Sequence, residues 1–174
     1  MKDERVVIFI DGSNFYHALK DNFGRADLDF EVLASKLCGE RRLIRTYYYN
    51  VPVDQRREPQ RYADQRRFFA RLHQTPYLTL KLGRLVYRGD VPIEKGVDVR
   101  LATEMLNLAW KDVYDTAIIV TGDGDFADAV ELVKELGKHV ENAFTRKGLS
   151  QDLYQACNRW VTLDEDSLKE CWLK

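Results

Sequence analysis

Two short apolar runs, residues 6–10 and 116–120, constrain the fold of this sequence more than any other feature. Neither run alternates apolar with polar residues, and this is how a strand reads when both of its faces are covered. Amphipathic helical stretches alternate with further strand-like segments along the rest of the chain. Buried strands separated by helices are typical of an open sheet with helices on both sides. We therefore expect an α/β fold in three layers around a mostly parallel sheet.

The remaining elements follow from hydrophobic periodicity and from start and stop signals. Strands are expected at residues 5–10, 43–51, 77–82, 84–87, 116–120, 140–144 and 160–163, and helices at 13–22, 30–37, 59–74, 97–111, 126–136 and 149–158, with a last helix at the C-terminus. Segments 77–82 and 84–87 read as two short strands or a hairpin, and residues 89–96 as a loop. The sequence has no internal repeat or linker, so residues 1–174 are expected to form a single domain.

Composition places this chain among ordinary globular domains. Its 174 residues are 45% hydrophobic and 32% charged, which excludes a disordered or low-complexity chain. No apolar run is long enough for a signal peptide or a membrane span. The three cysteines are widely spaced and form no CxxC pair, so neither a disulfide framework nor a thiolate zinc site is expected. We expect a cytoplasmic protein that does not engage a membrane.

Basic residues concentrate in one part of the chain. Residues 41–88 contain eleven arginines and one lysine against three acids, a net charge of +9, which leaves −10 for the remainder. The candidates for nucleic-acid binding are Arg56, Arg57, Arg61, Arg66, Arg67 and Arg71, with Tyr62, Phe68 and Phe69 interleaved. Arginines and aromatic rings suit a phosphate backbone and stacked bases, which favours single-stranded RNA as a partner. The alternative is a solvated helix face whose aromatic rings enter the core.

Acidic residues follow the two apolar strands. Asp11 ends the first strand, Asp123 and Asp125 follow the second, and Asp98 lies in the first turn of the helix that precedes the second. In a parallel sheet the carboxyl ends of neighbouring strands meet at one edge, so we expect these four carboxylates to converge. Such a cluster would repel itself unless it were protonated or bound a cation. Clustering of this kind favours a metal site over four unrelated acids.

The expected ion is Mg²⁺ or Mn²⁺, because the cluster offers oxygen ligands and no competing Cys or His. An ion of this kind activates water and stabilises charge during phosphoryl chemistry. Asn14, Thr121 and Ser150 lie close enough in the predicted fold to orient water or the carboxylates. Each residue also has a simpler interpretation, since Asp123, Asp125 or Ser150 would suit a helix cap and Asp98 would complement a helix dipole.

Several other motifs are nearly matched and then fail. Residues 122–127 fit G-x-G-x-x-A after a strand, but two aspartates within that loop would face the pyrophosphate of a dinucleotide. The same aspartates match the first ligands of a calcium-binding loop, but the later ligands of such a loop are absent. The sequence contains no P-loop and no G-x-S-x-G motif, and its three histidines lack ligand spacing.

Three segments in order resemble the NYN domain of the LabA-like group, within the PIN-like nuclease superfamily. They are FIDGSNF at residues 9–15, KGVDVRLA at 95–102, and VTGDGDF at 120–126 with ELGK at 135–138. The resemblance implies a PIN-like, Rossmann-like fold and a Mg²⁺- or Mn²⁺-dependent ribonuclease site. It places the metal-binding acids at Asp11, Asp98, Asp123 and Asp125, with Asn14 and Thr121 in support.

Two positions depart from the pattern of this family. Many relatives have Asp where this chain has Glu104, and Ser where it has Thr121. Glu104 lies six positions from Asp98 and so on another face of the helix, and we do not expect it among the metal ligands. Trp160 and Trp172 are compatible with either a core or a homodimer surface.

The leading hypothesis is a metal-dependent endoribonuclease that cleaves RNA phosphodiester bonds. A non-catalytic RNA-binding or regulatory module of the same fold is the alternative. A small-molecule phosphohydrolase is a third interpretation, and in that case the arginines would be dispensable.

Overall fold

The computed structural model describes residues 3–174, and its centre is a six-stranded sheet in which every neighbouring pair is parallel. The strands, in spatial order, are β3 (Leu78–Leu82), β2 (Arg42–Asn50), β1 (Arg5–Asp11), β6 (Thr116–Val120), β7 (His139–Phe144) and β8 (Arg159–Thr162). The two apolar runs of the sequence are thus paired at the centre of the sheet. The predicted mostly parallel α/β fold is confirmed.

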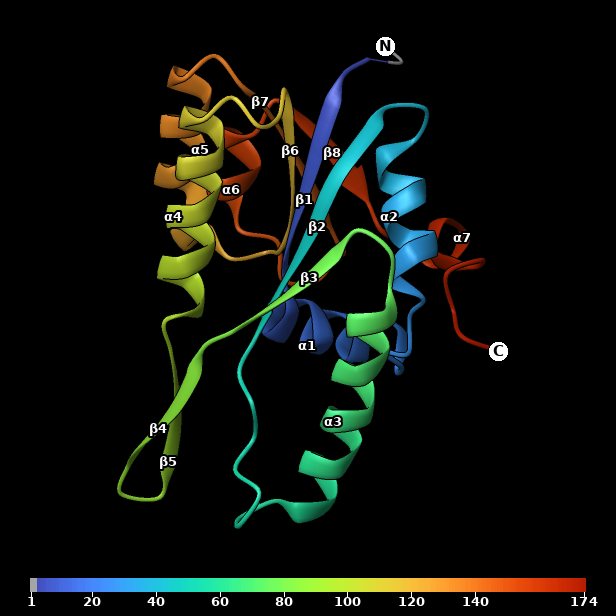
Figure 1. Ribbon diagram of the computed structural model, residues 1–174, viewed down its shortest axis with the longest axis vertical. Helices are drawn as coiled ribbons and strands as arrows, with labels where there is room; N and C mark the ends of the chain where they lie inside the picture. The colour runs from blue at the N-terminus through green and yellow to red at the C-terminus, as the bar shows by residue number, and fades with distance from the viewer. Residues whose placement is uncertain (1–2) are drawn as a thin grey trace.

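Helices cover both faces of this sheet (Figure 1). One face carries α1 (Gly12–Phe23), α2 (Phe30–Cys38), α3 (Pro59–Gln74) and the short α7 (Glu165–Leu168). The other carries α4 (Val97–Trp110), α5 (Ala127–Glu135) and α6 (Gln151–Ala156), with a 3₁₀ turn at Gly124–Phe126 leading into α5. Each predicted helix is present, although α6 is shorter than the helix expected at residues 149–158.

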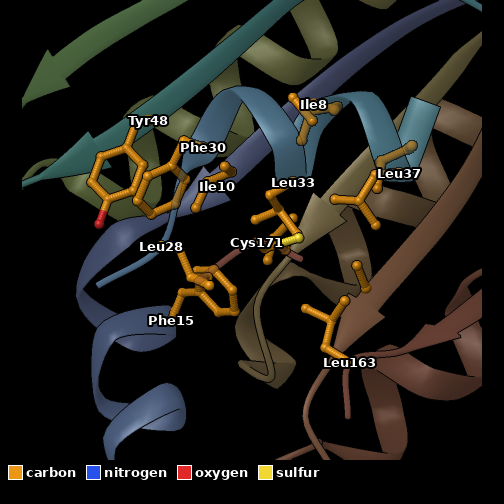
Figure 2. Packing of buried hydrophobic residues seen from close by; sticks show 14 of the residues in the cluster. Ile8, Ile10, Phe15, Leu28, Phe30, Leu33, Leu37, Tyr48, Leu163 and Cys171 are labelled. Carbon is orange, nitrogen blue, oxygen red and sulfur yellow. The ribbon is translucent and has the colours of Figure 1, made fainter. Parts of the chain in front are cut away.

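Alternate residues of β1 feed two separate cores, as a strand buried on both faces requires. Ile8 and Ile10 pack with α1 and α2, whereas Val7 and Phe9 pack with α4 and α5. Figure 2 shows the first core, in which Phe30 of α2 lies beside Ile10 and Tyr48. All five apolar side chains of β1, at residues 6–10, are at most 1% exposed. Burial of each contributes about 1.5–3 kcal/mol, so β1 anchors the fold.

The segment between the two halves of the sheet differs from the expectation. Of the two alternatives expected for residues 77–82 and 84–87, two short strands are correct and a hairpin between them is wrong, because β3 joins the main sheet beside β2. Residues 89–96, expected as a loop, contain β5 (Val91–Lys95), which pairs antiparallel with β4 (Arg84–Arg88). Gly89 and Asp90 form the two-residue turn of this hairpin. Pro92 and the exposed residues of β5 conceal the strand in the sequence, since edge strands tolerate both features.

The tryptophans and cysteines have structural surroundings of their own. Trp172 packs against the first core and lies edge-to-face with Phe23 at 5.7 Å between ring centroids. Trp160 stacks on Tyr154 at 4.6 Å and remains 40% exposed. All three cysteines are free and buried, as their spacing predicted. Across residues 3–174, no helix combines the length and the apolar character that crossing a bilayer demands.

Candidate active site

The order of the sheet reverses between β1 and β6, and this point positions the candidate site. Chain connections run outward from β1 toward β3 on one side and from β6 toward β8 on the other. Ligands in such sheets bind beyond the carboxyl ends of the strands at this reversal. Asp11 is the last residue of β1, and Thr121 directly follows β6. Helix α1, helix α3 and the β4–β5 hairpin lie at the same edge of the sheet (Figure 1).

Asp11 is held in a nearly closed environment, with 3% of its surface exposed. Its Oδ2 accepts a hydrogen bond from the Thr121 hydroxyl at 3.1 Å, and its Oδ1 accepts one from the backbone N–H of Asn14 at 3.3 Å. Burial raises the pKa of Asp11 to about 7, and the charges of Asp98 and Asp123 act in the same direction. The carboxyl group is therefore costly to ionise unless a cation compensates it.

Gly12 allows the chain to turn from β1 directly into α1. A Cβ atom at this position would lie 2.4 Å from both the Tyr49 carbonyl oxygen and the Tyr48 ring. Any side chain would therefore displace the backbone of β2. The lack of space for a Cβ atom explains why glycine follows Asp11. The close packing of Gly12 against β2 also holds Asp11 in place.

The loop after β6 is tied to α1 through side-chain hydrogen bonds. The Thr121 hydroxyl oxygen accepts from the Asp123 N–H at 3.1 Å, and the Asn14 side-chain oxygen accepts from the Gly122 N–H at 3.0 Å. Asp123 in turn accepts from the Asp125 N–H at 2.9 Å and caps the 3₁₀ turn. Thr121 and Asn14 therefore connect the two strand ends on which the acids lie.

Ser150 lies against the backbone of the same loop. Its N–H donates to the Gly122 carbonyl at 2.9 Å, and a Cβ atom on Gly124 would come within 2.4 Å of its hydroxyl oxygen. Its side chain does not cap α6, which was the simpler interpretation from the sequence. Ser150 thus supports the backbone that carries Asp123 and Asp125.

Asp98 approaches the other acids from the first turn of α4. Its pKa is raised by partial burial first, and then by the charges of Asp123, Glu94 and Asp125. The N-cap of α4 is Gly96, which provides no side-chain cap, so Asp98 is not a capping residue. These mutual effects on pKa indicate that the acids of the three segments lie within electrostatic reach of one another.

The donor chemistry of these acids suits Mg²⁺ or Mn²⁺. Within residues 3–174, none of Asp11, Asp98, Asp123 and Asp125 forms an ion pair with Lys, Arg or His. Hard divalent cations prefer such carboxylate oxygens. In the same described part of the chain, no three His, Cys, Asp or Glu side chains already stand close enough together to hold an ion. The donors fit the ion in kind, and their side chains are not yet closed around it.

Sequence reasoning missed Glu94 and its partner Ser13. The Ser13 hydroxyl donates to Glu94 Oε1 at 2.9 Å, which joins β5 to the start of α1. Glu94 also raises the pKa of Asp98. The acid was overlooked because residues 89–96 were expected to form a loop. The two-residue Gly-Asp turn at residues 89–90 is the signal that would have found this hairpin.

The predicted nucleic-acid-binding arginines divide into distinct groups. Arg57 lies 3.9 Å from the centre of the Tyr87 ring and pairs with Asp90 at 3.3 Å. Arg61 pairs with Glu58 and Arg67 with Asp64, whereas Arg56, Arg66 and Arg71 form no ion pair with any described residue. Arg61 and Arg71 line a groove between α1 and α3, and the other four do not.

Other parts of the basic segment have structural roles. Arg41 lies at the opposite edge of the sheet, where it forms a bidentate pair with Glu141. Phe68 and Phe69 pack against the first core, as the alternative interpretation of the aromatic residues predicted. Glu104 accepts hydrogen bonds from the Tyr49 hydroxyl at 2.7 Å and from Arg100 at 2.9 Å.

Comparisons with known proteins identify one family and one similar fold. The sequence model described as NYN domain matches residues 5–164. The low amplitude and bright protein LabA of Synechococcus elongatus is 27% identical over 171 residues, which cover 94% of this chain and 86% of that protein. A crystal structure of a Vibrio parahaemolyticus protein of unknown function superposes with a TM-score of 0.79 at 22% identity, covering 95% of this chain and 96% of that one. The latter likeness concerns the fold alone.

Proposed function

Because this chain belongs to the NYN domain family, whose members are generally nucleases, we propose that it is a metal-dependent ribonuclease. In this proposal Asp11, Asp98, Asp123 and Asp125 hold Mg²⁺ or Mn²⁺ and RNA phosphodiester bonds are hydrolysed beside them. One observation carries the proposal: at the reversal point of the sheet, buried Asp11 and its acidic neighbours have no cationic partner among residues 3–174. Uncompensated carboxylates are costly in an apoprotein and are explained by a bound cation.

The residues of the site have separate roles in this proposal. A bound divalent cation supplies an activated water and neutralises charge that develops on the phosphate. Thr121 and Asn14 fix the orientation of Asp11, through hydrogen bonds to its two carboxylate oxygens. The exposed side chains of Asp98 and Asp125 are free to turn toward an ion, which closing the site requires. Ser150 keeps the loop of Asp123 in place.

Single-stranded RNA is the proposed substrate. Arg61 and Arg71 line a groove that also contains Ser13 and Glu94, and in this proposal their positive charge compensates the phosphates of an approaching strand. Electrostatic guidance is needed here because the four acids alone would repel RNA. A single strand is favoured over a duplex, since its bases are free to contact aromatic side chains.

The test is cleavage of a panel of labelled RNAs by the purified protein. We expect cleavage with Mg²⁺ or Mn²⁺, its loss in EDTA, and its return when the metal is restored. Asp11→Asn should abolish cleavage while the circular dichroism spectrum stays unchanged, since Asn can still accept the hydrogen bond that caps α1. Wild-type protein that leaves every RNA intact with either metal would refute the enzyme, as would equal cleavage by the Asn variant.

A non-catalytic RNA-binding module of the same fold is the second candidate. One observation favours it: no three potential ligands in residues 3–174 are already close enough together to hold an ion. This candidate predicts RNA affinity without turnover. It further predicts that Asp11→Asn leaves the affinity unchanged, while substitution of the groove arginines lowers it.

A further inference from the structure

A groove of about 370 Å³ runs between α1 and α3 and begins beside the candidate active site. Ser13 and Glu94 lie in its wall next to the acids, and Lys20 lies in its wall at the last turn of α1. Lys20 lies seven positions after Ser13 along the helix, a span of about 10 Å. Its volume falls within the range of pockets that enclose small organic groups.

We propose that this groove binds the segment of single-stranded RNA next to the scissile phosphate, with an unpaired base against its aromatic wall and phosphates at Arg71 and Lys20. The inference rests on the proposed ribonuclease function and assigns to its substrate a definite path away from the acids. It divides the arginines of α3 into those that line the path and those that do not.

Aromatic side chains form much of the groove. Tyr48 and Phe30 are buried and form part of its inner surface, where their rings lie close together (Figure 2) and meet edge to face at 5.0 Å between centroids. Phe68 adds a half-buried ring from α3, and Tyr16 on α1 is 43% exposed. Every nucleobase has a flat face that stacks on such rings regardless of its sequence. A base held in a duplex cannot reach them, because it is stacked and paired within the helix.

Two cations of the groove, Lys20 and Arg71, are available to phosphates, whereas Arg61 pairs with Glu58. Neither Arg71 nor Lys20 forms an ion pair with any residue that the structure describes. Two of the carboxylates in its wall are already compensated by arginines outside it, Asp27 by Arg25 and Asp64 by Arg67. The part of the groove beyond Glu94 is therefore electrostatically suited to a polyanion.

One polar side chain is placed to contact a base edge. The Asn50 side-chain oxygen accepts from the N–H of Val51 at 2.7 Å, and its amide nitrogen donates to no described residue. Gln65 is occupied, since it bonds both the Val53 N–H and the Val51 carbonyl. Asn50 thus offers free amide donors within a groove whose other amide is committed to structure.

The test measures binding separately from cleavage. The full chain carrying Asp11→Asn is titrated into a labelled 12-nucleotide single strand in EDTA, and fluorescence anisotropy gives the affinity. Adding Tyr16→Ala or Arg71→Gln should weaken binding about 5- to 20-fold, in line with the loss of one stacking or phosphate contact. Matched controls are Trp110→Ala and Lys111→Gln, an exposed aromatic and an unpaired cation on α4 across the sheet, and neither should change the affinity more than about 2-fold.

Salt dependence and strandedness complete the test. Lys20→Gln with Arg71→Gln should reduce the slope of log affinity against log salt by about 1.4, since each phosphate contact on a single strand contributes about 0.7. The corresponding RNA duplex should bind more weakly than the single strand and respond less to Tyr16→Ala.

Three results would overturn the groove assignment: no RNA binding, unchanged binding by the groove variants, or an effect of Arg66→Gln as large as that of Arg71→Gln. If wild-type protein cleaves RNA while one of the last two results holds, the ribonuclease proposal stands and the groove proposal fails. If no RNA is cleaved but the groove variants lose affinity as expected, the ribonuclease proposal fails and the groove is still assigned to RNA binding.

Discussion

Acidic residues are compensated differently at the two ends of the central strands, the amino edge and the carboxyl edge. At the amino edge Arg5 binds Asp115 and Asp112, and Arg41 binds Glu141 at 2.8 Å. Hydrogen bonds from Arg5 lower the pKa of Asp115 to about 2. At the carboxyl edge burial raises the pKa of Asp11 to about 7, and no described cation pairs with it.

This difference distinguishes acids that stabilise the folded protein from acids that do not. An acid whose pKa is lowered stabilises the folded state when ionised, whereas an acid whose pKa is raised weakens it. Arginines pair with the acids at the amino edge, and the same kind of pairing would compensate acids at the carboxyl edge if only stability mattered there. The uncompensated acids of the carboxyl edge are therefore better explained by ligand binding than by folding.

The largest expected effect is a loss of RNA cleavage, and it is tested by an Asp→Asn substitution at each edge. Asp123→Asn should lower RNA cleavage by at least about 100-fold, or about 3 kcal/mol of transition-state stabilisation, because it removes a proposed metal ligand and keeps the cap of the 3₁₀ turn. The matched control is Asp112→Asn, which should leave the cleavage rate of folded protein unchanged. Single-turnover kinetics with Mn²⁺ provide the measurement. Equal losses at the two edges would remove the functional distinction between them.

The next effect is on stability and belongs to the amino edge. Glu141→Gln leaves the guanidinium of Arg41 without its bidentate partner, although the side chain of Arg41 is only 13% exposed. We expect a loss of about 3 kcal/mol in the free energy of unfolding, measured by urea denaturation. Cleavage by the folded variant should match wild type. A stability change within experimental error would mean that the ion pair at this edge is dispensable.

A smaller effect of opposite sign, an increase in stability, is expected for Asp11→Asn at the carboxyl edge. Between about pH 4 and pH 7 the unfolded chain has lost a proton that the folded, metal-free chain retains, so stability falls as pH rises through this window. Metal-free Asp11→Asn should therefore be more stable than wild type by about 2 kcal/mol at pH 8, a conservative conversion of the raised pKa.

Thermal unfolding in EDTA across this pH range measures the effect. The two proteins should converge below about pH 4, where Asp11 is protonated in both the folded and the unfolded wild-type chain. Addition of Mn²⁺ should stabilise wild type and not the variant. A variant less stable than wild type at pH 8 would show that the Asp11 charge is compensated in the apoprotein.

The sequence predicted the strand ends at the carboxyl edge because their signals are local. Asp11 and Asp123 each follow a strand whose continuous apolar run identifies it, and parallel packing then brings the strand ends to one edge. The NYN family was recognised from the same residues. The hairpin that contributes Glu94 was missed, since exposed β5 lacks the periodicity by which buried strands are recognised.

The amino edge could not be predicted in the same way. Arg5 and Asp115 are separated by 110 residues and Arg41 and Glu141 by 100, so no sequence window contains both partners. Arg41 was counted with the basic segment proposed for RNA, because composition does not distinguish a compensated arginine from a free one. The assignment of Arg61 and Arg71 to the groove likewise depends on which face α3 turns toward α1.

The smallest expected effect tests whether exposed pairs at the amino edge contribute to stability. The side chain of Asp115 is 41% exposed, and solvent screening limits its pairs with Arg5 to about 1 kcal/mol or less. Because its pKa is lowered, this contribution is complete above about pH 5 and is lost as pH falls from 4 toward 2. Asp115→Asn should thus destabilise the protein slightly at pH 7, and urea denaturation should find the difference from wild type vanishing near pH 2. A difference that persists at that pH would locate the effect in the hydrogen bond to the Arg5 backbone, and the charge contrast between the two edges would then depend on Asp112 and Glu141.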